Sequence, residues 1–341
     1  MKEIIKIQQK IAPELIKVVE RRYTILRAIF YLQPIGRRSL AEKLGISERK
    51  IRNDLEFLKQ EGFINSTSAG ARMTSRGNKL FYQLDDYVKA LQGLDKLEIE
   101  LSRKLGLKEV YIVPNTMNNT DTQQELGRFA AKLLQRKLKN EDVLAVTGGT
   151  TLAVVADLML PNQNLLEVTV VPGRGGLGEE VEIQANTIAA KIAKKLGGDY
   201  HLLHVPDNLN ESLLETIIKE PQIKEVLSLV EKADILIHGI GTAEVMAKRR
   251  GLKAEKIKEI LTAGAVGEAF GYYFSQTGEI VHSTASVGIQ LDDLKEIETT
   301  IAIAGGRTKA EAIISVVSNK YQDVLITDQH AAEEMLSLLR R

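Results

Sequence analysis

The 341-residue sequence contains no cysteine and no apolar run of about 18 residues. The absence of cysteine excludes disulfides, thiolate metal sites and thiol nucleophiles, and it agrees with a reducing compartment. The missing apolar run excludes a transmembrane helix, and the first 19 residues mix Lys and Glu with isoleucine, which is unlike a signal peptide. We therefore expect a cytoplasmic protein with no membrane partner.

The whole chain also lacks an excess of either charge, because its net charge is +1. The charge is nevertheless unevenly distributed along the chain. Residues 1–90 carry 18 Lys and Arg against 10 Asp and Glu, a net charge of +8, whereas residues 91–341 carry 28 against 35, a net charge of −7. With 44% hydrophobic residues, the chain can bury more than one core. We predict a DNA-binding domain with a helical linker over 1–90 and a second domain over 91–341.

Residues 36–64, GRRSLAEKLGISERKIRNDLEFLKQEGFI, predict two short helices around a tight turn. Gly45 allows the positive φ that closes the first helix, and the Ser47 side chain can accept the free N–H groups that start the second. In the second helix Ile51, Leu55 and Leu58 recur at i, i+4 and i+7, which defines its buried face. This arrangement predicts a helix-turn-helix and therefore DNA binding.

The second helix turns its polar and basic residues away from that buried face. Arg49 and Asn53 are expected to read base edges, because Arg pairs with guanine and Asn with adenine. Lys50 and Arg52 flank them and suit phosphates. The polar residues 65–72 then predict the hairpin of a winged helix. The predicted contacts with double-stranded operator DNA are Arg37, Arg38, Ser47, Arg49, Lys50, Arg52, Asn53 and Arg72.

Helical periodicity extends over the residues before and after this motif. Residues up to Tyr31 predict helix, with a new helix starting at Pro13. After the hairpin, apolar residues recur at alternating spacings of four and three: Leu80, Leu84, Tyr87, Leu91 and Leu94. This spacing fits either a dimeric coiled-coil seam or a helix packed on its own domain. We favour the dimer seam, because a protein that reads two half-sites needs a two-fold partner.

From about residue 110 short β-branched runs alternate with amphipathic helices, which indicates an α/β fold with a Rossmann-like parallel sheet. Four runs end in glycine-rich turns that lead into helices: 144–147 before Gly148-Gly149, 168–172 before Gly173 to Gly178, 235–238 before Gly239 to Gly241, and 300–304 before Gly305-Gly306. In a parallel sheet these turns lie at the carboxyl edge, where ligands bind. We expect them to converge on one site.

The turn at Gly148-Gly149 is followed by Thr150-Thr151 at a predicted helix start. Bare N–H groups, the helix dipole and two hydroxyls make this a candidate phosphate site. The segment has neither the spacing nor the lysine of a P-loop, so a nucleotide is weakly supported. Arg174 and Lys309 could add cations to the same phosphate. The pair Arg249-Arg250 could hold a second phosphate or complement a helix C-terminus.

Further stretches of this half of the chain are specific enough to carry a family resemblance. They read GGTT, VPGRGGLGEEVEIQANTIA, HGIGTAE, GEAFGYYF, SVGIQLDDL and AIAGGRTKAEAI. Together with the helix-turn-helix, the sequence resembles the SorC-type transcriptional regulators over essentially its whole length, and most strongly those of glycolytic genes. The resemblance implies a C-terminal sugar-phosphate-binding domain related to ribose-phosphate isomerases and glucosamine-phosphate deaminases. It also implies a repressor that assembles as a dimer or tetramer and is induced by fructose 1,6-bisphosphate or a related sugar phosphate.

Carried over by position, the resemblance assigns phosphate contacts to Gly148, Gly149, Thr150, Thr151, Arg174 and Lys309. It implicates four further residues in holding the rest of the ligand: Gln184, Arg249, Arg250 and Glu268. Two other roles stay open, since Glu268 could instead neutralise an arginine and Gln184 could cap a turn.

No cofactor besides this effector is expected, and no metal site, because adjacent carboxylates such as Asp292-Asp293 point in different directions. An alternative function is a sugar-phosphate isomerase or deaminase that carries a DNA-binding domain, with Glu268 or a histidine as base. A relative's fold does not transfer its chemistry, so we expect no catalysis and assign no catalytic residue. A further alternative is constitutive DNA binding, with a pocket that only stabilises the fold.

Overall fold

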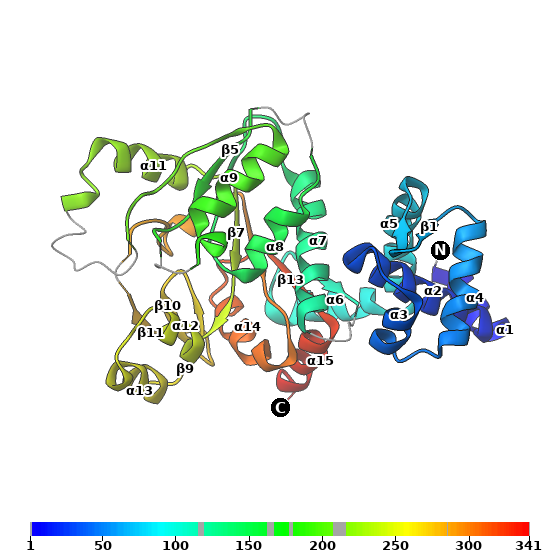
Figure 1. Cartoon of the computed structure of the whole chain (residues 1–341). Coiled ribbons are helices and arrows are strands. Elements are labelled where there is room, and N and C mark those ends of the chain that lie inside the picture. The colour runs from blue at the N-terminus through cyan, green and yellow to red at the C-terminus, as the bar shows by residue number, and fades with distance from the viewer. Residues whose placement is uncertain are drawn as a thin grey trace. The chain divides into compact units, whose positions relative to one another are not determined.

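The computed structural model describes residues 2–114, 119–161, 167–176, 180–206, 216–284 and 286–340. The chain divides into two compact units, Met1–Asp95 and Lys96–Arg341. Figure 1 shows the helices and strands of both units. No helix within the described residues combines the length and the apolar character needed to cross a membrane.

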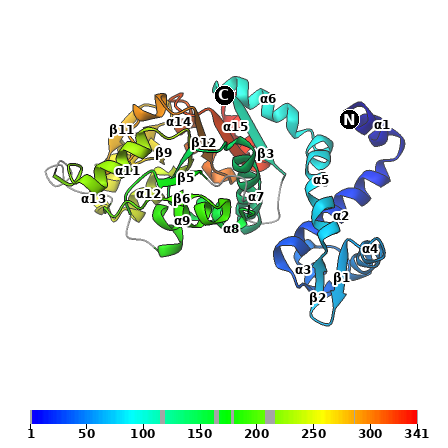
Figure 2. The same cartoon turned by 90° about the horizontal axis from the view of Figure 1, so that it is seen from above.

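The first unit is a winged helix-turn-helix, as the sequence predicts. Its elements are α1 (Lys2–Ile11), α2 (Pro13–Leu32), α3 (Arg37–Leu44), α4 (Glu48–Gln60), β1 (Ile64–Thr67), β2 (Gly70–Met73) and α5 (Ser75–Leu91). Strands β1 and β2 pair antiparallel and form the wing beside α4 (Figure 2). The core joins Leu40 of α3 and Ile51 of α4 to Ile25 and Ile29 of α2 and Phe81 of α5, all fully buried.

The predicted coiled-coil seam is instead packed within this unit. Leu80 and Leu84 pack on the winged-helix core, and Leu91 clusters with Ile5 and Ile16 of the first two helices. These contacts support the alternative that we left open, a helix packed on its own domain, and the dimer seam stays a prediction. The helix also ends at residue 91, and the backbone turns at residues 92–93 before α6 (Leu94–Leu105) begins.

The second unit contains a seven-stranded parallel sheet in the order β3-β13-β12-β7-β4-β5-β6. The strands are β3 (Glu109–Val113), β4 (Val143–Val146), β5 (Thr169–Pro172), β6 (Asp199–Tyr200), β7 (Ile235–Gly239), β12 (Thr299–Ile303) and β13 (Val324–Asp328). The four runs predicted to end in glycine turns are β12, β7, β4 and β5, four neighbouring strands. The predicted α/β fold is confirmed, although the end of the turn after β5, residues 177–179, lies outside the described residues.

Helices cover both faces of this sheet, which is why its central strands β7, β12 and β13 are almost entirely buried. One face packs on α7 (Asn119–Lys137), α8 (Thr150–Leu158) and α9 (Ala185–Leu196), which lie side by side in Figure 1. The remaining helices are α11 (Pro221–Glu231), α12 (Ala243–Arg249), α13 (Ala254–Thr262), α14 (Ala310–Val317), α15 (Gln329–Leu338) and the short 3-10 turns η1 (Val181–Ile183), η2 (Asp293–Lys295) and η3 (Arg307–Lys309). Of these, α11 contacts β4 and β5, and α15 contacts β3 and β13.

A second, four-stranded antiparallel sheet is inserted between β7 and β12 in the chain. It consists of β8 (Gly241–Thr242), β9 (Ala265–Ala269), β10 (Tyr272–Ser275) and β11 (Ile280–Ser283), in the order β11-β10-β9-β8. Helix α14 packs against β9 and β10. Because β8 follows directly on β7, this small sheet begins at the carboxyl edge of the parallel sheet and supplies one wall for anything bound there.

Candidate functional site

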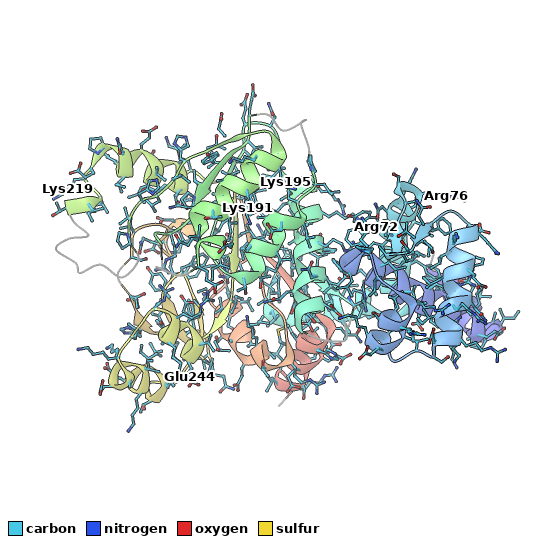
Figure 3. The ribbon with its side chains drawn as sticks, viewed as in Figure 1. Arg72, Arg76, Lys191, Lys195, Lys219 and Glu244 are labelled. Atoms are coloured by element: carbon cyan, nitrogen blue, oxygen red, sulfur yellow. The ribbon has the colours of Figure 1, made fainter. Side chains whose placement is uncertain are left out.

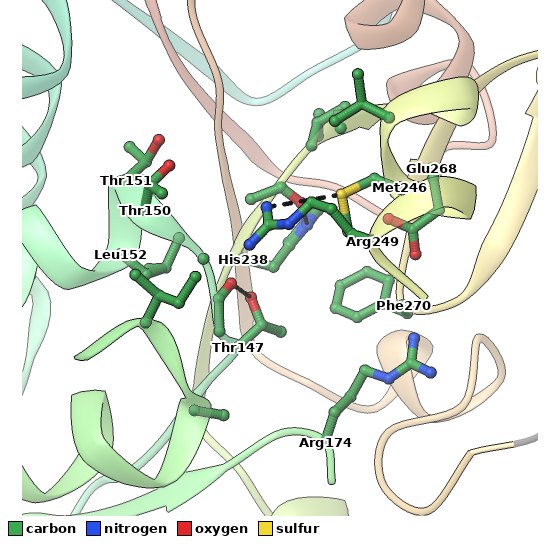
Figure 4. Close-up of a pocket in the computed structure, with 18 of the residues that line it drawn as sticks. Thr147, Thr150, Thr151, Leu152, Arg174, His238, Met246, Arg249, Glu268 and Phe270 are labelled. Carbon is green, nitrogen blue, oxygen red and sulfur yellow. Dashed lines mark hydrogen bonds between the residues drawn. The ribbon is translucent and has the colours of Figure 1, made fainter. Parts of the chain in front are cut away.

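The glycine-ended turns of β4, β5, β7 and β12 meet at the carboxyl edge of the parallel sheet, where the structure has a cavity of about 170 Å³. The ten residues that the sequence and the family resemblance mark for effector binding all line it: Gly148, Gly149, Thr150, Thr151, Arg174, Gln184, Arg249, Arg250, Glu268 and Lys309. Figure 4 shows how several of them face the same space. The structure thus brings the candidates together, and their binding of a ligand stays a prediction.

The turn after β4 requires glycine for steric reasons. A Cβ on Gly148 would lie 2.9 Å from the carbonyl oxygen of Ile183, and Gly149 has a φ of 127°. Gly149 donates its N–H to the same carbonyl at 2.8 Å. Helix α8 begins at the next residue, Thr150, so the N–H groups of its first turn have no partner within the helix. These donors, the helix dipole and the threonine hydroxyls suit a phosphate.

Two cations approach the cavity from different elements. Lys309 ends η3 and donates from Nζ to the carbonyl oxygen of Ile240 at 3.3 Å, and Arg249 ends α12. Burial lowers the pKa of Lys309, and the positive charge of Arg249 lowers it further. A bound anion would oppose both effects by stabilising the charged amine. The local electrostatics therefore favour an anionic ligand at this end of the cavity.

Arg250 and Glu268 form a buried ion pair in the cavity wall. Nη2 of Arg250 lies 2.7 Å from Oε1 of Glu268, and the two side chains are only 3% and 4% exposed. The same carboxylate oxygen accepts the N–H of Gly271 at 2.6 Å. Of the two roles predicted for Glu268, the structure shows the neutralisation of an arginine.

Gln184 and Arg174 belong to the part of the cavity wall that follows β5. Gln184 is the N-cap residue of α9, and its side chain makes no capping hydrogen bond to that helix. Arg174 is only 6% exposed, and its guanidinium packs on the turn at Gly271, where an added Cβ would meet Nη2 at 2.6 Å. Arg174 therefore joins the parallel sheet's edge to the small antiparallel sheet.

The predicted DNA-reading residues lie on the exposed side of α4, which we call the recognition helix. Arg49, Lys50, Arg52 and Asn53 are all exposed, and the buried Ile51 lies among them. The turn before the helix comprises residues 45–47, and Gly45 has the expected positive φ of 61°. This arrangement can present the four polar side chains to a groove.

The other predicted DNA contacts surround this helix. Ser47 is the N-cap residue, but its side chain makes no capping hydrogen bond, so the predicted capping interaction is wrong. Arg37 lies 2.9 Å from Glu48 and Arg38 lies 3.9 Å from the same carboxylate. Arg72 is exposed on β2 of the wing, where Figure 3 labels it.

Asp54 on the buried face of the recognition helix is held by two arginines of α2. Arg21 donates to it twice, from Nε at 2.6 Å and from Nη2 at 3.1 Å, and Nε of Arg22 donates at 3.0 Å. The hydrogen bond to Asp54 raises the pKa of Arg21. The guanidinium of Arg22 also lies 3.6 Å above the ring of Phe57. These contacts fix the recognition helix against α2, and we call them the Asp54 clamp.

Comparison with known proteins identifies the family. The Sugar-bind model, a sugar-binding domain, matches residues 89–337, and the model of the CggR N-terminal DNA binding domain matches residues 18–88. The central glycolytic genes regulators of Priestia megaterium and Bacillus subtilis are each 43% identical, with 98% of this chain and 99% of each relative covered. A SorC family regulator from Enterococcus faecalis superposes with a TM-score of 0.66 at 38% identity, covering 71% of this chain and 99% of its own. The chain belongs to the SorC-type transcriptional regulators.

Membership in the SorC-type regulators confirms the predicted family. The full-length sorbitol operon regulator SorC from Klebsiella pneumoniae shares the fold at 20% identity, with a TM-score of 0.67 over 96% of this chain and 99% of its own. The chain is thus a transcriptional regulator with a DNA-binding and a sugar-binding domain, rather than an enzyme. Among the described residues no group of three or more His, Cys, Asp or Glu side chains could hold a metal ion.

Among the lining side chains that were not predicted as effector contacts in this SorC-type regulator are His238 and Phe270. Burial lowers the pKa of His238 to about 4, so the imidazole is neutral near pH 7. Its Nδ1 lies 3.1 Å from the carbonyl oxygen of Gly239. The position of His238 at the end of a glycine-terminated strand was a usable signal. Nothing in the sequence around Phe270 indicated that its ring would face the cavity.

Proposed function

We propose that the chain is a cytoplasmic repressor of glycolytic genes whose hold on operator DNA is weakened by a sugar phosphate, fructose 1,6-bisphosphate. The target genes follow from the names of its 43%-identical relatives, the central glycolytic genes regulators. The proposal of this effector rests on the composition of the cavity. It combines a helix N-terminus with two threonines, at least four cationic side chains and the polar Gln184.

A sugar bisphosphate suits these groups because it carries an anionic group at each end and hydroxyls between them. The N-terminus of α8 can cradle one phosphate with backbone donors, and the arginines can form charge-assisted hydrogen bonds with the other. Burial and the positive charge of Arg249 both lower the pKa of Lys309, and a bound anion would offset both effects. Inducer action then requires that the ligand bind better to the protein state with weak operator affinity.

The test is operator affinity with and without fructose 1,6-bisphosphate at one fixed salt concentration, because salt alone changes DNA affinity strongly. The full chain should bind the operator more weakly when the bisphosphate is present. A Thr151→Val variant, which removes a hydroxyl at the phosphate end, should bind the operator normally and respond only at higher ligand concentrations. An operator affinity that the bisphosphate leaves unchanged would refute this inducer and favour constitutive binding.

A thermal screen against glycolytic intermediates checks the ligand independently of DNA. A ligand that binds only the folded protein stabilises it by about 2.7 kcal/mol at a hundred times its Kd. We expect the largest rise in melting temperature with fructose 1,6-bisphosphate.

We also propose that the repressor acts as a dimer or tetramer, since a two-fold operator requires a two-fold protein. Light scattering with and without operator measures this directly, and a monomer on DNA would contradict it.

A further inference from the structure

One wall of the cavity is built from a strained aromatic turn. Residues Tyr272 of β10 and Ala269 of β9 are paired, which leaves Phe270-Gly271 as a two-residue hairpin loop. Both loop residues have positive φ, 54° for Phe270 and 80° for Gly271. Such a turn prefers Asn-Gly, because the left-handed conformation disfavours a residue with a large side chain. The first loop position thus holds an unfavourable residue.

Phe270 is unusual because it is a buried aromatic residue in a left-handed conformation. A left-handed conformation costs a non-glycine residue about 1–2 kcal/mol. Three non-glycine residues of the described chain adopt it, Glu141, Phe270 and Lys320, and Phe270 alone among them is buried. Glu141 and Lys320 are exposed polar residues, for which a turn conformation is common. A buried aromatic ring held in this conformation points to a role for the ring.

Three neighbours hold the turn in place. The N–H of Gly271 donates to Glu268 at 2.6 Å, and its carbonyl oxygen accepts the N–H of Thr284 at 3.0 Å. The guanidinium of Arg174 packs so closely on Gly271 that a Cβ there would lie 2.6 Å from Nη2. The turn is therefore fixed by two of the predicted effector-binding residues, and the direction of the Phe270 ring is fixed with it.

The ring of Phe270 faces the cavity and packs against the neutral imidazole of His238. Its centroid lies 4.3 Å from that of the His238 imidazole, at an interplanar angle of 45°. In Figure 4 the ring lies between Arg174 and the side chains of Arg249 and Glu268. The cavity thus contains an apolar surface among its cationic groups, and phosphate oxygens gain no hydrogen bond from such a surface.

We infer that Phe270 is a specificity-determining residue whose ring packs on the carbon skeleton of the sugar phosphate. The face of an aromatic ring is electronegative and attracts the slightly positive C–H groups of a sugar, and the contact removes apolar area from water. Anions without a carbon skeleton gain nothing from this wall. The inference deepens the proposed function, because it rests on a sugar phosphate as the ligand of this cavity.

The test compares sugar phosphates with an anion that has no carbon, in the full-length chain. Calorimetric titrations with fructose 1,6-bisphosphate, fructose 6-phosphate and inorganic pyrophosphate are made on wild type, Phe270→Leu and Phe270→Tyr. The leucine variant should lose about five- to tenfold in affinity for both sugars and less than about twofold for pyrophosphate. The tyrosine variant keeps the ring face and should restore the sugar affinities. If the leucine variant does not fold, Phe270→Met replaces it.

Equal losses for sugars and pyrophosphate would overturn the inference, because they would show that Phe270 only maintains the shape of the cavity. Unchanged sugar affinity in the leucine variant would overturn it as well. Failure of the proposed effector gives a different pattern. If fructose 1,6-bisphosphate does not bind the wild type, that effector is refuted. The affinities of the wild type and the Phe270 variants for fructose 6-phosphate then decide the role of the ring. Failure of both sugars to bind wild type would overturn the effector and the inference together.

Discussion

The Asp54 clamp gives the most direct prediction for the DNA-binding unit. The Asp54→Asn substitution keeps the shape of the side chain and removes its charge. In the native protein this carboxylate is 3% exposed and accepts three hydrogen bonds from Arg21 and Arg22, whose side chains are 27% and 29% exposed. The substitution therefore leaves two partly buried guanidinium groups facing a neutral amide whose NH2 group cannot accept a hydrogen bond.

The size of the effect lies between two limits. Breaking a fully buried ion pair by removing one partner costs about 3–5 kcal/mol. Exposed ion pairs contribute about 0–1 kcal/mol, because water screens them. The clamp joins a buried carboxylate to arginines that are about a quarter exposed, and asparagine can still accept one hydrogen bond. We expect a loss of about 2 kcal/mol in the stability of this unit.

Hydrogen exchange measures this loss locally in the full-length chain. A destabilisation of about 2 kcal/mol should speed exchange of the most protected α4 amides by about thirtyfold. Glu56→Gln is the matched control, since Glu56 is exposed on the same helix and should have an effect within about 0.5 kcal/mol. The amides of β12 serve as an internal reference. Equal α4 protection in the Asp54→Asn and Glu56→Gln variants would refute our account of the clamp.

Three further predictions concern base reading, ligand affinity and acid stability. Arg49→Ala or Asn53→Ala should relax the sequence preference of DNA binding in operator selections. Lys50→Ala should weaken binding to all DNA sequences alike and make the affinity less dependent on salt concentration. Equal behaviour of the three variants would mean that the base-reading face of α4 is misplaced. A bound phosphate should raise the lowered pKa of the Lys309 amine, so the complex holds this proton more tightly than the free protein does. Calorimetry should therefore show that sugar-phosphate affinity falls as the pH rises through the pKa that Lys309 has in the free protein. Lys309→Met should flatten this fall. The buried His238 has a pKa of about 4, whereas its pKa in the unfolded chain is 6.5. As the pH falls, the imidazole is therefore protonated in the unfolded chain before it is protonated in the folded one. Stability should fall by up to about 3 kcal/mol between pH 7 and pH 4, and urea unfolding of His238→Gln should show a smaller fall.

Local patterns in the sequence were enough to place the main elements and the cavity. Gly45 requires a left-handed turn and Ile51 fixes a buried helix face, so the helix-turn-helix follows from short-range chemistry. The four glycine-ended runs converge because parallel strands place all their carboxyl ends at one edge. This rule and the family resemblance together predicted the ten candidate residues, and all ten line the same cavity.

The features that sequence reasoning missed depend on contacts between distant residues. Asp54 looks like an exposed helix carboxylate until α2 brings Arg21 and Arg22 to it. The apolar stripe that includes Leu91 fits a dimer seam equally well, and its spacing does not show that Ile5 of the same chain packs against it. The ring of Phe270 acquires its direction from a turn that is held by Glu268 on β9, Arg174 after β5 and Thr284 after β11. Periodicity carries no information about such pairings.

The order of strands in the parallel sheet has a consequence for how the protein is made. Strand β3 is the first of the sheet in the chain, but among the described strands its neighbour is β13, the last. A growing chain therefore releases the complete winged helix from the ribosome long before the sheet can close, and N-terminal units generally fold first during synthesis. A messenger cut short before β13 would yield a DNA-binding unit attached to an unfinished sensor. Such a fragment is expected to keep a folded winged helix while β3 of its second unit lacks the strand that it pairs with, so damage near the end of the gene should unfold the second unit before the first.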